Sequence, residues 1–421
     1  MNYSDPQLPL APMSKSIRRV RLAVVVSHPI QYYVPLYCRL AARDEIDLKV
    51  FFTWHAAAGA QRDYGFKRKL RWDIPLTEGY EHELVANTSR SPGTHHFWGL
   101  RNPGLVDRVL AWKPDAVHVT GYAFASHLLS IWAFSRRGIP VLFRGDSHLL
   151  DDQQRGLRWT AKRWFLTRVY RRVEAALYVG KNNYEYYRTF GVPDSKLLYC
   201  PHSIEVERFA EPNEELEGKA RQLRSDLKIN ESTKVLLFTG KFERKKQPLE
   251  LMSAVARLRG MDLVLLLVGN GELEDQVEQR ARQDPEVFRV LPFQNQSRMP
   301  VVYRAGDIFI LPSAYGETWG LAVNEALASG RRALISDKVG CGSDLIQSER
   351  DGAIFEARDW SDFDEKLRKL LTQEPDPATI RRKAQMFDVD VTEARLCEAL
   401  EQVRRMQKGK TTGKLMLRCD R

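Results

Sequence analysis

Short apolar segments that alternate with longer amphipathic ones constrain the fold of this chain more than any other feature. Each short apolar segment is rich in β-branched and aliphatic residues, as expected for strands buried on both faces of a parallel sheet. The alternation starts at Val20 and forms two successive blocks in the 421 residues, which predicts two Rossmann-like domains rather than one very wide sheet. In the first block we expect strands at Val20–Ser27, Asp47–Phe52, Ala116–Thr120, Val141–Arg144, Ala176–Val179 and Lys196–Tyr199. In the second block we expect them at Lys234–Thr239, Asp262–Val268, Val287–Leu291, Ile308–Leu311, Ala333–Ser336 and Ala353–Phe355.

The expected domain limits follow from the places where polar segments interrupt this alternation. A short polar stretch from Pro201 to Pro212 follows a predicted strand, so we place the break between the two α/β domains there. The predicted parts are a disordered N-terminus (1–16), a first domain (17–203), a second domain (204–390), a C-terminal helix (391–407) and a frayed basic tail (408–421).

The composition is that of an ordinary globular protein, with 43% hydrophobic and 28% charged residues. No apolar run approaches the roughly 20 residues that a membrane-spanning helix needs, and the N-terminus lacks the charged-then-apolar pattern of an export signal. The five cysteines are scattered, odd in number and free of Cys-x-x-Cys spacing. We therefore expect reduced thiols and a cytoplasmic location.

The net charge of +11 favours an anionic partner, which the composition leaves open as a nucleotide, a phospholipid or a nucleic acid. Basic and aromatic residues are most concentrated in the segment from Arg155 to Arg172. A helix of this kind can lie on an anionic membrane surface, at the inner face of the cell membrane. It can equally bury its aromatic face in the protein and solvate its basic face.

The segment from Leu311 to Gly330 is the most informative about chemistry. A strand leads into a polar turn that offers Glu317, and a helix that carries Glu325 then opens near Gly320. A helix N-terminus attracts an anion, and a carboxylate accepts hydrogen bonds from sugar hydroxyls. If the intervening residues are mostly helical, a separation of eight positions corresponds to a rise of roughly 12 Å, whereas a glycosidase carboxylate pair needs about 5 to 9.5 Å. The two glutamates are thus expected to act separately on one elongated ligand, a sugar joined to a phosphate.

The pattern Glu317-x7-Glu325, followed by Ala-Leu-Ala-Ser-Gly and a strand, resembles the signature of the retaining glycosyltransferases of family 4, the glycosyl transferases group 1, which have the GT-B fold. The resemblance implies that Glu317 lies against the donor sugar and that Glu325 holds the ribose of the nucleotide. Thr318, Trp319, Gly320 and Leu321 are then expected to bind the donor. It also implies that residues 17–203 bind the acceptor and residues 204–390 the nucleotide sugar.

Three turns in the second half extend the resemblance. Gly240 and Lys241 follow the first strand of that half, and Lys246 comes five residues after Lys241, so the two lysines can converge on a diphosphate. They match a Gly-Arg...Lys element of the family, although lysine in place of arginine loses the bidentate geometry. Gly269 resembles the family's Gly-x-Gly turn. Phe293 lies where the family places the nucleobase, although it is also compatible with a core position.

The first half offers candidates for the acceptor side of a cleft. His28 and Gln31 follow the first strand, and His28 either touches a ligand or caps the next helix. After the strand that ends at Arg144, the family commonly has a cleft histidine. Counting places Asp146 at that position and His148 two residues later, so both remain candidates.

The expected reaction is transfer of a sugar from a nucleotide diphosphate sugar to a saccharide or lipid-linked acceptor, with retention, as in bacterial cell-surface polysaccharide biosynthesis. We expect neither a metal nor another cofactor, because lysines and a helix end can carry the leaving group. Asp-x-Asp pairs at Asp362 and Asp388 lie in predicted helical regions and are interpreted as surface acids. The alternatives are a sugar-nucleotide epimerase of the same fold, or a basic membrane- or nucleic-acid-binding protein with an inactive cleft. Of the anionic partners, we expect no nucleic acid.

Overall fold

The fold is described from a computed structural model that covers residues 19–54, 61–62, 69–70, 72–152, 155–210 and 213–419. Side chains are described within these ranges except at 61–62, 69–70 and 408–419. The predicted N-terminal segment 1–16 lies outside the described residues.

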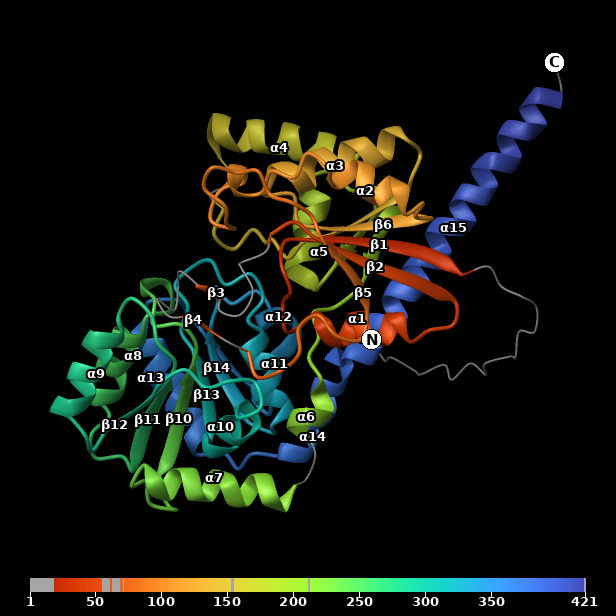
Figure 1. Cartoon of the computed structure of the whole chain (residues 1–421). Coiled ribbons are helices and arrows are strands. Elements are labelled where there is room, and N and C mark those ends of the chain that lie inside the picture. Colours follow the sequence, from red (N-terminus) through yellow and green to blue (C-terminus); the bar gives the residue numbers. More distant parts are fainter. Residues whose placement is uncertain are drawn as a thin grey trace.

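Two parallel sheets form two lobes, as predicted (Figure 1). All the predicted strands are present, with ends that differ by no more than one residue from those expected. The first sheet has the order β5-β2-β1-β6-β7-β8-β9, with strands β1 (Val20–Val26), β2 (Ile46–Phe52), β5 (Glu81–Leu84), β6 (Ala116–Thr120), β7 (Val141–Arg144), β8 (Ala175–Tyr178) and β9 (Leu197–Tyr199). The second has the order β12-β11-β10-β13-β14-β15, with strands β10 (Lys234–Thr239), β11 (Leu263–Val268), β12 (Phe288–Leu291), β13 (Ile308–Leu311), β14 (Arg332–Ser336) and β15 (Gly352–Phe355). A two-stranded ladder joins β3 (Gln61–Arg62) to β4 (Lys69–Leu70).

Helices cover both faces of each sheet, which explains why the strands are apolar on both sides. Within β1, Leu22 and Val24 pack into one core cluster while Ala23 and Val25 pack into another. The helices of the first lobe are α1 (Val34–Ala41), α2 (Leu105–Ala111), α3 (Ala125–Arg136), α4 (Gly156–Tyr170) and α5 (Lys181–Thr189). The other helices are α6 (Val206–Ala210), α7 (Glu214–Asp226), α8 (Pro248–Ala256), α9 (Glu274–Gln283), α10 (Met299–Ala305), α11 (Leu321–Ala328), α12 (Gly342–Leu345), α13 (Trp360–Leu371), α14 (Pro377–Ala384) and α15 (Val389–Cys419). Single 3₁₀ turns occur at Phe97–Gly99, Asp194–Lys196, Arg244–Lys246 and Gln385–Phe387.

The strand order fixes where a ligand can bind. In the first sheet the order reverses direction between β1 and β6, and in the second it reverses between β10 and β13. In open parallel sheets, ligands bind outside the carboxyl ends of the strands at such reversal points. The turns after β1, β10 and β13 are therefore the segments to examine.

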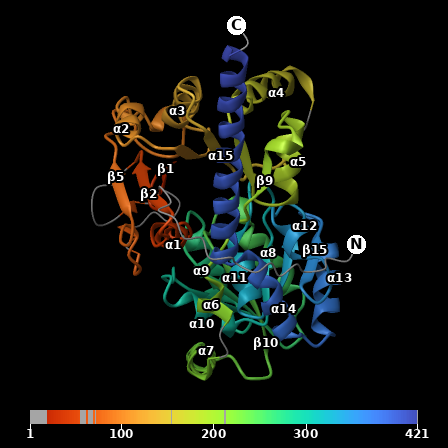
Figure 2. The same cartoon turned by 90° about the vertical axis from the view of Figure 1, so that its right-hand side faces the viewer.

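The chain passes between lobes near the predicted break. Cys200 packs into the core of the first lobe, and Ile204 packs into the core of the second. Helix α15 then returns to the first lobe, where Leu396, Leu400 and Val403 join the cluster that contains β1. Figures 1 and 2 show α15 leaving the second lobe, passing along the first and projecting beyond it.

The secondary structure differs from the sequence interpretation in two places. The segment 408–421 was expected to be a frayed tail, but helix α15 continues to Cys419. This segment has no proline, and its lysines, leucines and methionine favour a helix over the breaks that Gly409 and Gly413 would introduce. Strand β5 was missed because it is a largely exposed edge strand, Glu-His-Glu-Leu, without the apolar pattern of a buried one. Among the described helices none combines the length and hydropathy needed to cross a membrane.

Candidate functional site

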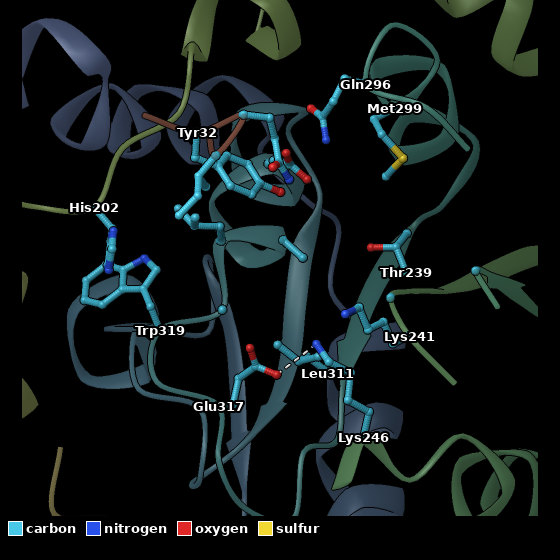
Figure 3. Close-up of a pocket in the computed structure, with 18 of the residues that line it drawn as sticks. Tyr32, His202, Thr239, Lys241, Lys246, Gln296, Met299, Leu311, Glu317 and Trp319 are labelled. Carbon is cyan, nitrogen blue, oxygen red and sulfur yellow. Dashed lines mark ion pairs between the residues drawn. The ribbon is translucent and has the colours of Figure 1, made fainter. Parts of the chain in front are cut away.

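A cavity of about 530 Å³ lies between the lobes, at the strand ends identified above (Figure 3). It brings together residues that are far apart in the sequence and come from both sheets. Of the predicted site residues, those that line it are His28, Gln31, Asp146, Gly240, Lys241, Lys246, Gly269, Phe293, Glu317, Thr318, Trp319, Gly320, Leu321 and Glu325. His148 is not among the lining residues.

Glu317 and Lys246 form an ion pair in the cavity wall. The Lys246 Nζ atom lies 2.9 Å from Glu317 Oε2, and both side chains are only 15% exposed. The hydroxyl of Ser313 also donates a hydrogen bond of 3.1 Å to Oε2. Burial alone would raise the pKa of Glu317, but Lys246, with smaller contributions from Lys245 and Ser313, holds it below the usual carboxyl value. Glu317 is therefore ionised near neutral pH.

Three lysines line this side of the cavity. Figure 3 shows Lys241 and Lys246 extending toward the space beside Glu317. Lys245, which the sequence interpretation did not single out, also lines the cavity, with its Nζ 3.5 Å from Glu243 Oε2. Together they can neutralise a diphosphate by charge.

The N-terminus of helix α11 faces the same space. Gly320 is its N-cap residue and has a φ of +98°, which side chains other than glycine rarely adopt. A Cβ atom there would also lie 2.9 Å from Val339. The first backbone N–H groups of a helix lack partners within it, so α11 offers donors to an anion held by the lysines.

The predicted Gly-x-Gly turn has a steric basis. Gly269 has a φ of +150°, and a Cβ atom at this position would lie 1.9 Å from the carbonyl oxygen of Gly240. Gly271 has a φ of +157°, and a Cβ atom there would lie 2.8 Å from the backbone of Phe242. The two glycines thus let the turn after β11 pack directly on the turn after β10 that carries Lys241.

Replacing Gly269 by Ala should lower the free energy of unfolding by about 3 kcal/mol or more, because overpacking and backbone strain add. Gly218→Ala is the matched control, since Gly218 lies in α7 with open space around it. That change should raise the free energy of unfolding by up to about 1 kcal/mol. Thermal unfolding of both variants measures the difference. Equal melting temperatures would contradict the steric account.

Glu325 is buried beneath the cavity floor, with only 2% of the residue exposed. The hydroxyl of Tyr303 donates a hydrogen bond of 2.6 Å to its Oε2 atom. Its other oxygen, Oε1, has no hydrogen-bond partner in the described part of the chain. Burial raises the pKa of Glu325, and Tyr303, Arg208 and Tyr32 only partly counteract this. Glu325 thus has a buried acceptor atom that no described residue satisfies by the hydrogen-bond geometry.

Two tyrosines beside Glu325 were missed in the sequence. Tyr32 comes from the turn after β1 and Tyr303 from α10, and both line the cavity. Burial and the nearby carboxylate of Glu325 raise the pKa of the Tyr32 phenol. Tyr32 lies inside the segment that contains His28 and Gln31, but nothing in its local pattern indicates a contact with the second lobe.

Phe293 lies at the cavity and not in the core. It is partly exposed, and its ring meets the Trp72 ring of the first lobe edge-on, with centroids 5.9 Å apart. Such a partly exposed aromatic pair can contact the face or edge of a base. The alternative of a core position for Phe293 was wrong.

Asp146 lines the cavity and links the two lobes. The Thr318 hydroxyl donates a 2.9 Å hydrogen bond to Asp146 Oδ2, and His202 Nε2 lies 3.7 Å from the same atom. The partial burial of Asp146, whose side chain is 44% exposed, would raise its pKa, but His202 and Thr318 outweigh this and lower the pKa to about 2. Asp146 is therefore a permanent anion at neutral pH. His202, which the sequence interpretation missed, is buried between the Tyr33 and Trp319 rings.

This lowered pKa predicts an acid-dependent contribution to stability. A carboxyl group whose folded pKa lies below its ordinary value of 3.8 stabilises the fold above that value and loses the effect as pH falls toward 2. Solvent screens part of the effect because the side chain is 44% exposed, so we expect about 1 kcal/mol. The melting temperature of Asp146→Asn should be below that of the native protein at pH 6 and approach it by pH 2.5. A constant difference across this range would contradict the assignment.

The other two candidates of the first lobe have different surroundings. His28 lines the cavity, accepts or donates a 2.9 Å hydrogen bond with Ser27 Oγ, and meets the Trp54 ring edge-on. It does not cap α1, because the N-cap position of that helix is Tyr33. His148 lies behind the cavity wall, with its Nε2 3.1 Å from the backbone oxygen of Glu317. Asp146, and not His148, is thus the group that faces the cavity.

In the part of the chain that the structure describes, no group of three or more His, Cys, Asp or Glu side chains is arranged to hold a metal ion. The expectation that no metal is needed stays a prediction, as do the roles assigned to the individual site residues.

Comparison with known proteins identifies related sequences in both lobes. A family described as "Glycosyl transferases group 1" matches residues 219–387, and one described as "Glycosyl transferase 4-like domain" matches residues 77–202. D-inositol 3-phosphate glycosyltransferase of Geodermatophilus obscurus is 29% identical over 217 residues, 48% of this chain and 46% of that protein. UDP-Gal:alpha-D-GlcNAc-diphosphoundecaprenol alpha-1,3-galactosyltransferase of Escherichia coli is 28% identical over 177 residues, 41% of this chain and 44% of that protein. The match spans less than half of each of these relatives.

The fold as a whole is also found among solved structures. HepE of Anabaena, solved in complex with UDP and glucose, superposes with a TM-score of 0.66 over 91% of this chain and 100% of its own, at 14% sequence identity. At this identity the likeness shows the fold alone. The two family matches, one in each lobe, show that the chain belongs to the glycosyl transferases group 1 family, and the superposition shows that it has the GT-B fold.

Proposed function

We propose that this protein transfers a glycosyl group from a nucleotide diphosphate sugar to a hydroxyl group of an acceptor, with retention of configuration at the anomeric carbon. The observation that carries the proposal is the convergence of Lys241, Lys246, Glu317 and the N-terminus of α11 on one cavity between the lobes. This arrangement offers positive charge to a diphosphate and a carboxylate to the sugar next to it. Family membership supports the same reaction class.

In the proposed reaction the bond between the anomeric carbon and the diphosphate oxygen breaks as the acceptor oxygen bonds to that carbon from the same face. The acceptor proton passes to the departing phosphate oxygen. Lys241, Lys246 and the N–H groups at the start of α11 stabilise the charge that develops there, and a preorganised donor of this kind contributes about 3 to 4 kcal/mol. No metal is needed for this step, because these groups supply the positive charge.

Glu317 and Glu325 have separate roles in the proposal. Glu317 is ionised and held by Lys246 and Ser313, so it can stabilise a positive anomeric centre and accept bonds from the sugar hydroxyls. Glu325 has a buried, unpartnered oxygen among the described residues, which the ribose hydroxyls would satisfy. Phe293 and Trp72 would contact the base.

A panel of sugar nucleotides tests the proposal. UDP-glucose, UDP-galactose, GDP-mannose, ADP-glucose and the free nucleotides should be compared by thermal shift, with UDP first because HepE was solved with UDP. A ligand at 100 times its Kd stabilises the fold by about 2.7 kcal/mol. The expected result is stabilisation by one base class and slow hydrolysis of the matching sugar nucleotide. The absence of both for every compound would overturn the donor assignment.

A lipid-linked acceptor is the proposed partner on the other side of the cavity. The name of the Escherichia coli relative describes an acceptor on diphosphoundecaprenol, and helix α4 suits contact with an anionic membrane. Leu157, Trp164 and Phe165 on α4 are 90%, 60% and 39% exposed. Of the aromatic residues in this segment, only Trp159 and Tyr170 pack into the lobe. The alternative in which the aromatic face is buried thus accounts for only half of the aromatic side chains.

The double substitution Trp164→Ser and Phe165→Ser should weaken binding to vesicles that contain phosphatidylglycerol by about tenfold or more, since burying each ring contributes about 1.5 to 3 kcal/mol. Binding of the native protein should also fall as salt is raised. Co-sedimentation with vesicles measures both effects. Met386→Ser is the control, because Met386 is 53% exposed on the second lobe. An equal loss in the control, or binding to neutral vesicles alone, would contradict the assignment to α4.

A further inference from the structure

The loop after β7 contacts the turn that carries Glu317 through consecutive hydrogen bonds. Residues 146–151 belong to the first lobe and residues 316–318 to the second, and the two segments run past each other in opposite order. The first hydrogen bond joins Thr318 Oγ1 to Asp146 Oδ2 (2.9 Å), and the second joins His148 Nε2 to the backbone oxygen of Glu317 (3.1 Å). In the third, the backbone nitrogen of Gly316 donates to Asp151 Oδ2 (2.8 Å).

The orientation of His148 is fixed by a second contact. The backbone N–H of Leu150 donates a hydrogen bond of 3.2 Å to His148 Nδ1, so this nitrogen is the acceptor. The proton of the neutral ring then resides on Nε2, which donates to the carbonyl oxygen of Glu317. With the residue only 9% exposed, its ring has one orientation in which both hydrogen bonds form.

The carbonyl oxygen of Glu317 accepts hydrogen bonds from both lobes. His148 provides one, and the backbone N–H of Gly340 in the second lobe provides the other at 3.0 Å. On the side-chain end, Lys246 and Ser313 hold the carboxylate. The second lobe alone therefore holds the carboxylate, and the first lobe completes the support of the backbone beneath it.

We propose that residues 146–151 form a clamp that completes the donor-sugar site, with His148 as a positioning residue for Glu317. This inference rests on the proposed function. It means that the backbone of the turn that carries Glu317 is held in part by a hydrogen bond from the first lobe, while the carboxylate itself is held by the second lobe. Asp146 links this clamp to the acceptor side, because it both bonds Thr318 and faces the cavity.

The first test needs no ligand. Hydrogen–deuterium exchange of the amides from 313 to 320 should be compared in the native protein, His148→Ala and Asp151→Ala. The loss of one hydrogen bond should speed exchange of this turn by about tenfold. Lys181→Ala is the matched control, because it removes another bond between the lobes, from Lys181 Nζ to the Ser343 oxygen at 3.0 Å. Exchange of residues 313–320 should not change in that variant.

The second test separates positioning from binding. UDP affinity should be the same in His148→Ala as in the native protein, because the lysines and Glu325 do not depend on this bond. The rate of UDP-glucose hydrolysis should fall by about tenfold. His148→Gln, whose amide can also donate to the Glu317 oxygen, should restore most of the rate. If His148 had only a structural role, its replacement would change UDP affinity and the rate of UDP-glucose hydrolysis together. The rate would then be no higher in His148→Gln than in His148→Ala.

Exchange that stays unchanged in His148→Ala overturns the clamp, as does a loss of UDP affinity equal to the loss of rate. If the native protein neither binds UDP nor hydrolyses UDP-glucose, the choice of this donor fails. The exchange experiment then still decides whether His148 holds the turn.

Discussion

Glu317→Gln should lower turnover of the cognate sugar nucleotide by roughly 10² to 10³-fold, the cost of losing one preorganised electrostatic group. The amide keeps the shape of the side chain and its contact with Ser313, but it cannot stabilise positive charge at the anomeric carbon. UDP should bind at least as tightly as before, because Lys246 loses its competing partner at 2.9 Å and is available to the diphosphate. Steady-state kinetics and calorimetric titration with UDP separate the two effects.

The control for this variant is Glu349→Gln. Glu349 forms an ion pair with Lys369 on the surface of the second lobe, with both side chains more than half exposed. Exposed pairs contribute little, so turnover should not change. Full activity in Glu317→Gln would show that Glu317 does not act at the reacting centre. It would also contradict the separate roles proposed for Glu317 and Glu325.

Lys246→Met should weaken UDP binding by about 100-fold, because a charge-assisted contact contributes up to about 3 kcal/mol. The same change leaves the Glu317 carboxylate without its closest cation in a partly buried site, so the free energy of unfolding should fall by about 2 to 3 kcal/mol. Adding Glu317→Gln should restore much of the stability but none of the affinity. Calorimetric titration and thermal unfolding of the single and double variants measure both.

The loss of stability in Lys246→Met should depend on pH in one direction. The pKa of Glu317 lies below its ordinary value of 4.5 in the native protein, so its pairing stabilises the fold above that pH and is lost as the pH falls further. The difference in stability between Lys246→Met and the native protein should therefore shrink in acid. Lys366→Met, which breaks a partly exposed pair with Asp362 on α13, is the control and should change stability by less than about 0.5 kcal/mol. A difference that is the same at pH 3 and pH 7 would contradict the pairing.

The strands and the family could be predicted because their signals are local. Buried parallel strands are apolar on both faces, so segments such as Leu263–Val268 are recognisable without knowledge of their neighbours. The spacing of Glu317 and Glu325 likewise reflects one turn and one helix, although α11 begins only at Leu321 and part of the interval is a turn. The confirmed part of the interpretation consists of such short-range patterns.

The contacts between the lobes could not be predicted in this way. Tyr32 beside Glu325, and His202 between Tyr33 and Trp319, depend on how two separately folded lobes meet. His148 was a candidate for the cleft but does not line the cavity, and its partner is a backbone oxygen of residue 317, which leaves no signal in side-chain identity. The sequence therefore indicates which residues line the cavity more reliably than it indicates which residues hold them in place.

The return of α15 to the first lobe has a consequence for biosynthesis. Leu396, Leu400 and Val403 fill the core beneath β1 and β2, although the ribosome adds them almost four hundred residues after Val20. The first lobe is thus translated first, but its core is completed last. The second lobe can fold before it. An expression fragment that stops at the end of the first sheet would leave that core open to water, so the two lobes are not interchangeable modules.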